Sequence, residues 1–167
     1  YLDSTKCQTM IVGGWNDEQN LYGILNSFKK MYKSAPDSKA QLVLGPWSHG
    51  HPKRRDSAYY LGDIFYGYDL SKNYQEQIEF NYFENHLKGR GEAPSFRAHV
   101  FNTGAKKWVD YMDNPFDDEL DTLSMFLNSN GKLSNEKSDK SLSYVSDPDH
   151  PVPFIQDDNF YVMAPKH

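Results

Sequence analysis

The sequence predicts an α/β fold that passes into a β-rich region, and two observations predict it. Two short apolar runs, residues 9–12 and 41–44, flank an amphipathic helical pattern, as in a strand–helix–strand unit. The segment Lys88-Gly89-Arg90-Gly91-Glu92-Ala93-Pro94 then ends the helical periodicity, and only short β-like runs follow it. We therefore expect an α/β domain over residues 1–91 and a β-sandwich domain over residues 92–167.

The helix between the two apolar runs is predicted from the i, i+3, i+4, i+7 spacing of its apolar residues. They are Leu21, Ile24, Leu25, Phe28, Met31 and Tyr32, with Asn26, Lys29 and Lys30 on the opposite side. Asp17 is a suitable N-cap, and Ser34-Ala35-Pro36-Asp37 ends the helix. A helix of this length allows the flanking strands to pair in parallel through a right-handed connection.

A second helix is predicted from about Leu70 to Leu87, with Asp69 or Ser71 as its cap and Gly89 as its end. Its apolar side consists of Tyr74, Ile78, Tyr82, Phe83 and Leu87. Residues 96–101, 107–111 and 122–127 are expected to be antiparallel strands, and Asn130-Gly131 is expected to form a hairpin turn. Residues 134–166 are polar and rich in proline, so the sandwich is incomplete. Its open edge allows self-association into a homo-oligomer.

Composition and charge exclude several classes of partner. The formal net charge is −5 and the pI is about 5.6, which argues against a nucleic-acid partner or an acidic membrane surface. The basic run Lys53-Arg54-Arg55 is short and is interpreted as a solvated loop. Mean hydropathy is −0.80, but aromatic residues make up 15% of the chain and can supply a core. No apolar run is long enough to span a membrane.

The single cysteine, Cys7, excludes an intramolecular disulfide and is interpreted as a packed or edge thiol. This cysteine usage fits a cytoplasmic protein and equally a periplasmic or secreted one. Tyr1 does not fit a native start, so the absence of a visible leader leaves the localisation open.

Two polar segments that follow the predicted strands carry the chemistry. Gly13-Gly14-Trp15-Asn16-Asp17-Glu18 follows the first, and Gly45-Pro46-Trp47-Ser48-His49-Gly50 follows the second. Because neighbouring parallel strands end at one edge of a sheet, Asp17 and His49 are expected to lie within hydrogen-bond reach. A carboxylate that orients an imidazole supplies two members of a Ser-His-Asp system. The third member is missing, since no Gly-x-Ser-x-Gly occurs in these residues.

Each of these residues also has a simpler interpretation. Asp17 can serve as an N-cap alone, and Glu18 can be a backup acid but is more typical of a solvated first-turn carboxylate. His51 is a competing base, and His49 with His51 could suggest a metal pair; without further ligands nearby, we expect no metal and no cofactor. Trp15 and Trp47 are packing residues or walls of a substrate pocket.

Three motifs at these positions resemble a known family. They are Gly-Gly-Trp-Asn-Asp-Glu-Gln-Asn-Leu-Tyr-Gly (13–23), Leu-Gly-Pro-Trp-Ser-His-Gly (44–50) and Phe-Glu-Asn-His-Leu-Lys-Gly (83–89). They are similar to the X-prolyl dipeptidyl peptidase-like serine hydrolases, which include bacterial cocaine esterase, α-amino acid ester hydrolases and glutaryl-type cephalosporin acylases. Two later segments, Val100-Phe101-Asn102-Thr103-Gly104 with Trp108 and Ser146-Asp147-Pro148 before Pro151-Val152-Pro153, also resemble that family.

The resemblance implies that residues 1–91 are the C-terminal portion of an α/β-hydrolase domain, a βαβ unit plus a helix. Residues 92–167 would then be the N-terminal part of a jelly-roll β-sandwich. It also implies that Asp17 is the acid and His49 the base of a catalytic triad. The serine nucleophile, the oxyanion hole and the helical cap of such enzymes precede these motifs and have no counterpart in the sequence.

Two functions remain open at this point. The first is a C-terminal fragment of a serine hydrolase that cleaves a small-molecule ester or amide through an acyl-enzyme, as acylases and α-amino acid ester hydrolases do. Under this hypothesis the 167-residue chain alone is inactive, because it lacks the nucleophile. The alternative is a non-catalytic β-sandwich binding or assembly module that carries a remnant of a hydrolase sheet.

Overall fold

The computed structural model describes residues 1–53, 59–61, 64–116, 121–141 and 143–152, and the chain divides into two compact units. The first unit contains residues 1–116, and the second lies within residues 117–156. Arg54 and Arg55, from the basic run that we interpret as a solvated loop, lie outside the described residues, as do the residues from 153 onward.

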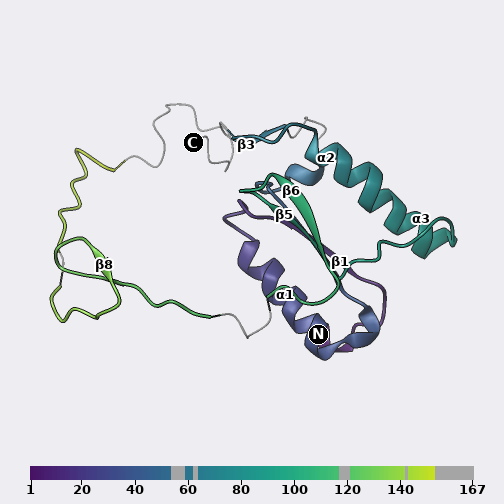
Figure 1. Cartoon of the computed structure of the whole chain (residues 1–167), viewed down its shortest axis with the longest axis horizontal. Coiled ribbons are helices and arrows are strands. Elements are labelled where there is room, and N and C mark those ends of the chain that lie inside the picture. The colour runs from purple at the N-terminus through teal and green to yellow at the C-terminus, as the bar shows by residue number, and fades with distance from the viewer. Residues whose placement is uncertain (54–58, 62–63, 117–120, 142, 153–167) are drawn as a thin grey trace. The chain divides into compact units, whose positions relative to one another are not determined.

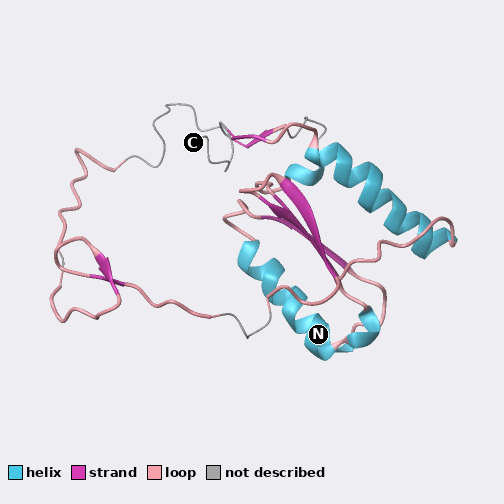
Figure 2. Ribbon diagram, viewed as in Figure 1, coloured by secondary structure: helices cyan, strands magenta, loops and turns pink. Residues whose placement is uncertain are grey.

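The first unit is built on a four-stranded sheet in the order β1-β2-β5-β6 (Figures 1 and 2). These strands are β1 (Met10–Gly14), β2 (Gln41–Gly45), β5 (Ala98–Asn102) and β6 (Lys107–Tyr111). β1 pairs in parallel with β2, β2 in parallel with β5, and β5 antiparallel with β6. The predicted parallel strand–helix–strand unit is confirmed, and the fold is a mixed α/β fold with a largely parallel sheet.

The two faces of the sheet are covered by different helices. α1 (Leu21–Ser34) packs on one face, and the helical segment that starts with α2 (Leu70–Asn73) lies on the other (Figure 2). Leu42 and Leu44 belong to the core on the α1 side, and Val43 belongs to the opposite core. All three are fully buried because β2 lies inside the sheet, and each contributes about 1.5–3 kcal/mol of burial.

The predicted second helix is continuous but contains a π-helical turn. α2 leads into the π-helical turn Tyr74–Glu79, and α3 (Phe80–Lys88) follows. Asp69 caps the start by accepting a hydrogen bond from the Lys72 N–H at 3.0 Å, and Gly89 ends the helix with φ +63°, as predicted.

The buried face of this helix changes after the π turn. Tyr74, Ile78 and Tyr82 are buried as expected, but Phe83 and Leu87 are 49% and 75% exposed. A π turn holds an extra residue, so it rotates the following side chains relative to a regular α-helical register. The predicted apolar side is therefore wrong for its last two members.

The strand predictions after residue 91 are correct in part. β6 matches its predicted range and β5 overlaps the predicted range 96–101, but β5 adds in parallel to β2 and so extends the same sheet rather than opening a sandwich. A parallel partner cannot be recognised from a single strand's sequence. The division into domains at residues 91 and 92 lies inside the first unit; the division itself, and a jelly roll over residues 92–167, stay predictions.

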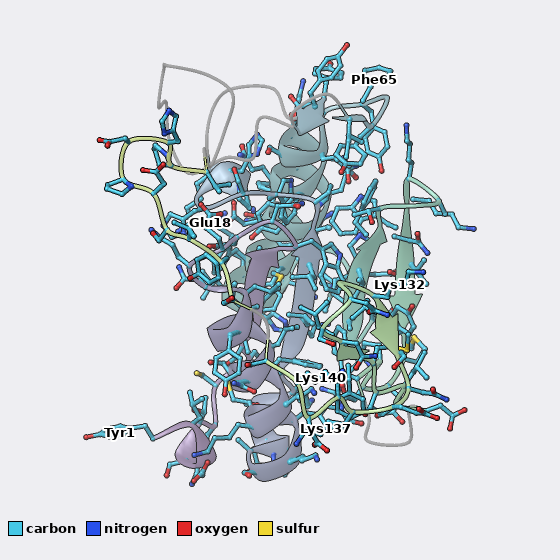
Figure 3. The ribbon with its side chains drawn as sticks, turned by 90° about the vertical axis from the view of Figure 1, so that its left-hand side faces the viewer. Tyr1, Glu18, Phe65, Lys132, Lys137 and Lys140 are labelled. Atoms are coloured by element: carbon cyan, nitrogen blue, oxygen red, sulfur yellow. The ribbon has the colours of Figure 1, made fainter. Side chains whose placement is uncertain are left out.

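The remaining described strands form short hairpins. In the first unit, β3 (Tyr60–Leu61) pairs with β4 (Ile64–Phe65), and the Lys106 ammonium group donates to the carbonyl of Phe65, whose ring is exposed (Figure 3). In the second unit, β7 (Phe126–Leu127) pairs with β8 (Leu133–Ser134). Gly131 has φ +74° in the connecting turn, which confirms the predicted Asn-Gly turn, whereas residues 122–125 are not strand.

Shorter helical turns occur at Leu2–Ser4, Pro36–Ser38 and His51–Lys53. No helix in the described part of the chain is long and apolar enough to cross a membrane.

Candidate active site

The loops that follow β1 and β2 are tied together by backbone hydrogen bonds. The Trp15 N–H donates to the Gly45 carbonyl at 2.9 Å, and the Asn16 N–H donates to the Trp47 carbonyl at 3.0 Å. These bonds continue the parallel pairing of the two strands beyond the end of the sheet. The residues that come next in each loop, Asp17 and His49, are therefore held side by side by the backbone itself.

Asp17 is buried, with 6% of its surface exposed. Its Oδ1 accepts hydrogen bonds from the N–H groups of Gln19 and Asn20 at 3.1 and 3.0 Å. Helix α1 begins at Leu21 with Asn20 as its N-cap, so the predicted helix start at Asp17 is wrong by one turn. The carboxylate instead closes a turn of its own that precedes the helix.

His49 faces this carboxylate. Its Nδ1 lies 3.2 Å from Oδ2 and 3.3 Å from Oδ1 of Asp17, so the predicted contact is confirmed. The imidazole is 41% exposed, whereas the aspartate side chain is 8% exposed. A buried carboxylate behind a more accessible imidazole is the arrangement in which the histidine, and not the aspartate, can meet a substrate.

The hydrogen bonding indicates which ring nitrogen carries the proton. Because Nδ1 faces two carboxylate oxygens, it must be the protonated nitrogen of the neutral ring. The Nδ2 atom of Asn20 also lies 3.2 Å from Nδ1. Because two donors would then face each other, we assign this amide in the flipped orientation, with its oxygen toward the ring. In this tautomer the lone pair is on Nε2, so the ring can act as a base on the side away from Asp17.

The pair opens into a groove of about 940 Å³ that runs along β1. Its walls come from the strand β1, the helix α1, the loop that carries His49, and the π-helical turn with its neighbours. β1 is an edge strand of the sheet, with β2 as its partner among the described strands. The groove therefore lies where a further segment can approach both the edge strand and the Asp17–His49 pair.

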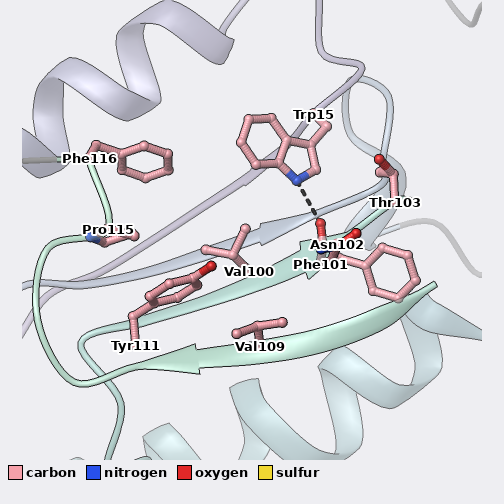
Figure 4. Close-up of a pocket in the computed structure, with 9 residues that line it drawn as sticks. All are labelled: Trp15, Val100, Phe101, Asn102, Thr103, Val109, Tyr111, Pro115 and Phe116. Carbon is pink, nitrogen blue, oxygen red and sulfur yellow. Dashed lines mark hydrogen bonds between the residues drawn. The ribbon is translucent and has the colours of Figure 1, made fainter. Parts of the chain in front are cut away.

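The two tryptophans beside the pair lie in different places. Trp15 lines a second cavity of about 330 Å³, and its Nε1 donates to the Phe101 carbonyl at 2.9 Å (Figure 4). Trp47 is fully buried, and its ring packs edge-on against Tyr74 with the centroids 5.4 Å apart. The roles of Trp15 and Trp47 as walls of a substrate pocket stay predictions.

The other candidate residues do not take part in the Asp17–His49 contact. Glu18, the residue after Asp17 in the sequence, is exposed (Figure 3). His51 begins the short helical turn that follows His49. No group of three or more histidine, cysteine, aspartate or glutamate side chains among the described residues is arranged to hold a metal ion. Cys7 is exposed.

The structure also shows contacts that the sequence did not reveal. His99 is hydrogen-bonded to Asp110 across β5 and β6, and its ring stacks between Phe96 and Trp108. Ser71 and Gln75 donate hydrogen bonds to the loop that carries His49. No sequence signal marks these contacts, because each joins segments whose proximity depends on the tertiary fold.

Comparison with known proteins places this site in context. Residues 1–51, which contain both Asp17 and His49, match the sequence profile of the X-Pro dipeptidyl-peptidase (S15) family. The predicted resemblance to this family is confirmed. The cocaine esterase of Rhodococcus sp. (strain MB1 Bresler) is 26% identical over 162 residues, which cover 87% of this chain and 26% of the esterase.

Two solved structures resemble this chain along most of its length. An aminopeptidase from the marine sediment archaeon Thaumarchaeota archaeon aligns with a TM-score of 0.73 and 29% identity, covering 93% of this chain and 26% of that protein. A selenomethionine-labelled α-amino acid ester hydrolase aligns with a TM-score of 0.70 and 24% identity, covering 92% of this chain and 27% of that protein. The second likeness concerns the fold alone. The chain spans about a quarter of the length of the relatives that it matches.

Proposed function

We propose that Asp17 and His49 are the acid and base of a Ser-His-Asp triad in a serine hydrolase that cleaves an ester or amide bond. The observation that supports this most directly is the contact of 3.2 Å between Nδ1 of His49 and the buried carboxylate of Asp17. The similar esterase and aminopeptidase are hydrolases, and the match of this chain to the X-Pro dipeptidyl-peptidase (S15) family covers both residues. The proposal includes an acyl-enzyme reaction of the acylase or α-amino acid ester hydrolase type.

In the proposed reaction, a serine from another segment of the complete enzyme attacks the substrate carbonyl while His49 Nε2 takes its proton. The tetrahedral intermediate collapses, the bond to the leaving group breaks, and Nε2 returns the proton to that group. Water then attacks the acyl-enzyme, again losing a proton to Nε2, and the serine is released with a proton from the ring. Asp17 holds the Nδ1–H tautomer and stabilises the imidazolium that forms in each step.

The proposal extends to the architecture of the complete enzyme. The four-stranded sheet and its helices would be the C-terminal part of an α/β-hydrolase sheet. Because β5 and β6 belong to this sheet, the jelly-roll domain would begin later than the predicted residue 92, with the β7–β8 hairpin. The likeness of the chain to the α-amino acid ester hydrolase fold supports the α/β part of this assignment. The serine would reach Nε2 from the groove along β1.

The test is hydrolysis of p-nitrophenyl acetate by the full-length protein. His49→Ala should abolish turnover, and Asp17→Asn should lower kcat by about 10⁴-fold, as loss of the orienting carboxylate does in such triads. His51→Ala and Glu18→Gln are the matched controls, since each removes a neighbouring group of the same type, and both should retain activity. Full activity in His49→Ala would overturn the triad.

The isolated 167-residue chain provides a second test. Without a nucleophile it should show only the background rate of ester hydrolysis. Robust turnover by this chain that is lost in Ser48→Ala would identify Ser48 as the nucleophile instead. No hydrolysis in the full-length protein, across esters and amides, would favour the non-catalytic binding or assembly module.

A further inference from the structure

The loop that carries His49 turns away from the site within a few residues. Gly50 has φ +71°, a left-handed conformation that favours glycine, and the short helical turn His51–Lys53 follows. Inside the loop, the His51 N–H donates to the Ser48 carbonyl and the Lys53 N–H to the Gly50 carbonyl, each at 3.2 Å. These local bonds shape the loop but do not attach it to the rest of the fold.

Two side chains of the helical segment that begins at Leu70 attach the loop from outside. The Ser71 hydroxyl donates to the His51 carbonyl at 3.1 Å, and the Gln75 side-chain amide donates to the Pro52 carbonyl at 2.7 Å. Ser71 is 1% exposed, so its hydroxyl is buried and bonded to a loop carbonyl. A buried donor of this kind is costly to leave unpaired, which makes the contact specific.

The same helical segment also packs against Trp47, which precedes His49 in the loop. The Tyr74 ring packs edge-on against the Trp47 ring, and the Trp47 carbonyl accepts a hydrogen bond from the Asn16 N–H in the loop of Asp17. Leu70 and Ser71 are buried, and Gln75 lies in the π-helical turn. Turns of this type are frequent at functional sites. The helical segment therefore holds the His49 loop both before and after the histidine.

We infer that Ser71 and Gln75 are positioning residues, which hold the loop so that the His49 imidazole stays aligned with Asp17. This inference rests on the proposed acid–base role of His49. The imidazole is 41% exposed, so packing restrains it less than it restrains the buried aspartate. Reaction rates are sensitive to such alignment, since a misplacement of about 1 Å can cost roughly 10²-fold in rate.

The kinetic test uses Ser71→Ala, Gln75→Met and the double variant in the full-length protein with p-nitrophenyl acetate. Each single variant should lower kcat several-fold and the double variant by about 10- to 100-fold, with KM nearly unchanged, because neither side chain is placed to touch substrate. Gln75→Lys keeps a donor for the Pro52 carbonyl and should restore part of kcat. Lys72→Met, at an exposed position between the two residues, should have the activity of the unaltered protein.

A structural measurement separates this inference from the proposed function. Hydrogen–deuterium exchange followed by mass spectrometry should show faster exchange of residues 48–53 in the double variant than in Lys72→Met. Faster exchange together with active His49→Ala would support the attachment of the loop and refute the triad. If His49→Ala loses activity, but the double variant keeps both its kcat and its exchange rates unchanged, the positioning role is refuted. Gln75→Met preserves the buried serine and keeps the test informative if Ser71→Ala fails to fold.

Discussion

Substitution of Gly14 tests whether the close approach of the two loops that carry Asp17 and His49 depends on the absence of a side chain at this position. A Cβ at Gly14 would lie 2.0 Å from the carbonyl oxygen and 2.6 Å from the carbonyl carbon of Trp47. These are backbone atoms of the loop that leads to His49, and the same carbonyl accepts the Asn16 N–H. Gly14→Ala therefore cannot be accommodated by a side-chain rotation; the loops must separate.

The expected cost follows from this geometry. Overpacking a well-packed site costs about 1–3 kcal/mol of unfolding free energy, and a backbone obstacle favours the upper end. Gly23→Ala is the matched control, because Gly23 lies in α1 and a Cβ there meets nothing within 4 Å. Alanine in a helix interior is favoured over glycine by about 0.5–1 kcal/mol, so this control should stabilise the protein. The two variants should thus differ by roughly 1.5–4 kcal/mol.

Urea unfolding followed by tryptophan fluorescence measures the difference in stability. Hydrolysis of p-nitrophenyl acetate by the full-length protein then reports on the site, and Gly14→Ala should lower kcat. If Gly14→Ala were as stable as Gly23→Ala and as active as the unaltered protein, the close contact between the loops would not be what positions Asp17 and His49.

Three further measurements test the packing and the electrostatics. Burial and the neighbouring Glu79 raise the pKa of Tyr74, so the unfolded chain loses the phenol proton before the folded chain does as the pH rises past about 10. The free energy of unfolding, measured with urea at several pH values, should therefore fall above that pH. It should fall less in Tyr74→Phe, which has no phenol to titrate. Trp15→Phe removes the donor to the Phe101 carbonyl and should lower the unfolding free energy by about 0.5–1.5 kcal/mol in the same assay. Leu44→Ala should cost about 2–5 kcal/mol because Leu44 is fully buried, whereas Leu87→Ala, at a position 75% exposed, should change stability by no more than about 0.5 kcal/mol.

Local patterns were sufficient to predict the part of the fold that carries the site. The periodicity of residues 21–32 depends on burial of one helix face, and the apolar runs before Asp17 and His49 depend on burial inside the sheet. Gly89 was recognisable as a helix end because its left-handed conformation excludes most other residues. The Asp17–His49 contact followed from these elements, since neighbouring parallel strands end at one edge of a sheet.

Features that depend on distant segments could not be predicted in the same way. The sequence of β5 carries no sign that its partner is β2, which lies more than fifty residues earlier. The π-helical turn at Tyr74–Glu79 has the composition of an ordinary helix, and only its packing shows the change of register. For the same reason Ser71 was considered as a cap, although its hydroxyl bonds to the His51 carbonyl.

The origin of the Asp17–His49 geometry bears on how the proposed triad would be assembled. Asp17 is held by two N–H groups of its own loop, and the two loops are joined by the backbone bonds from Trp15 to the Gly45 carbonyl and from Asn16 to the Trp47 carbonyl. All of these contacts lie within the strand–helix–strand unit and its flanking helix, so the acid and the base are aligned without the nucleophile. The segment that carries the serine then has only to place one hydroxyl beside Nε2. Activity would then depend on the orientation of that segment relative to the edge of β1 as well as on the alignment of His49 with Asp17.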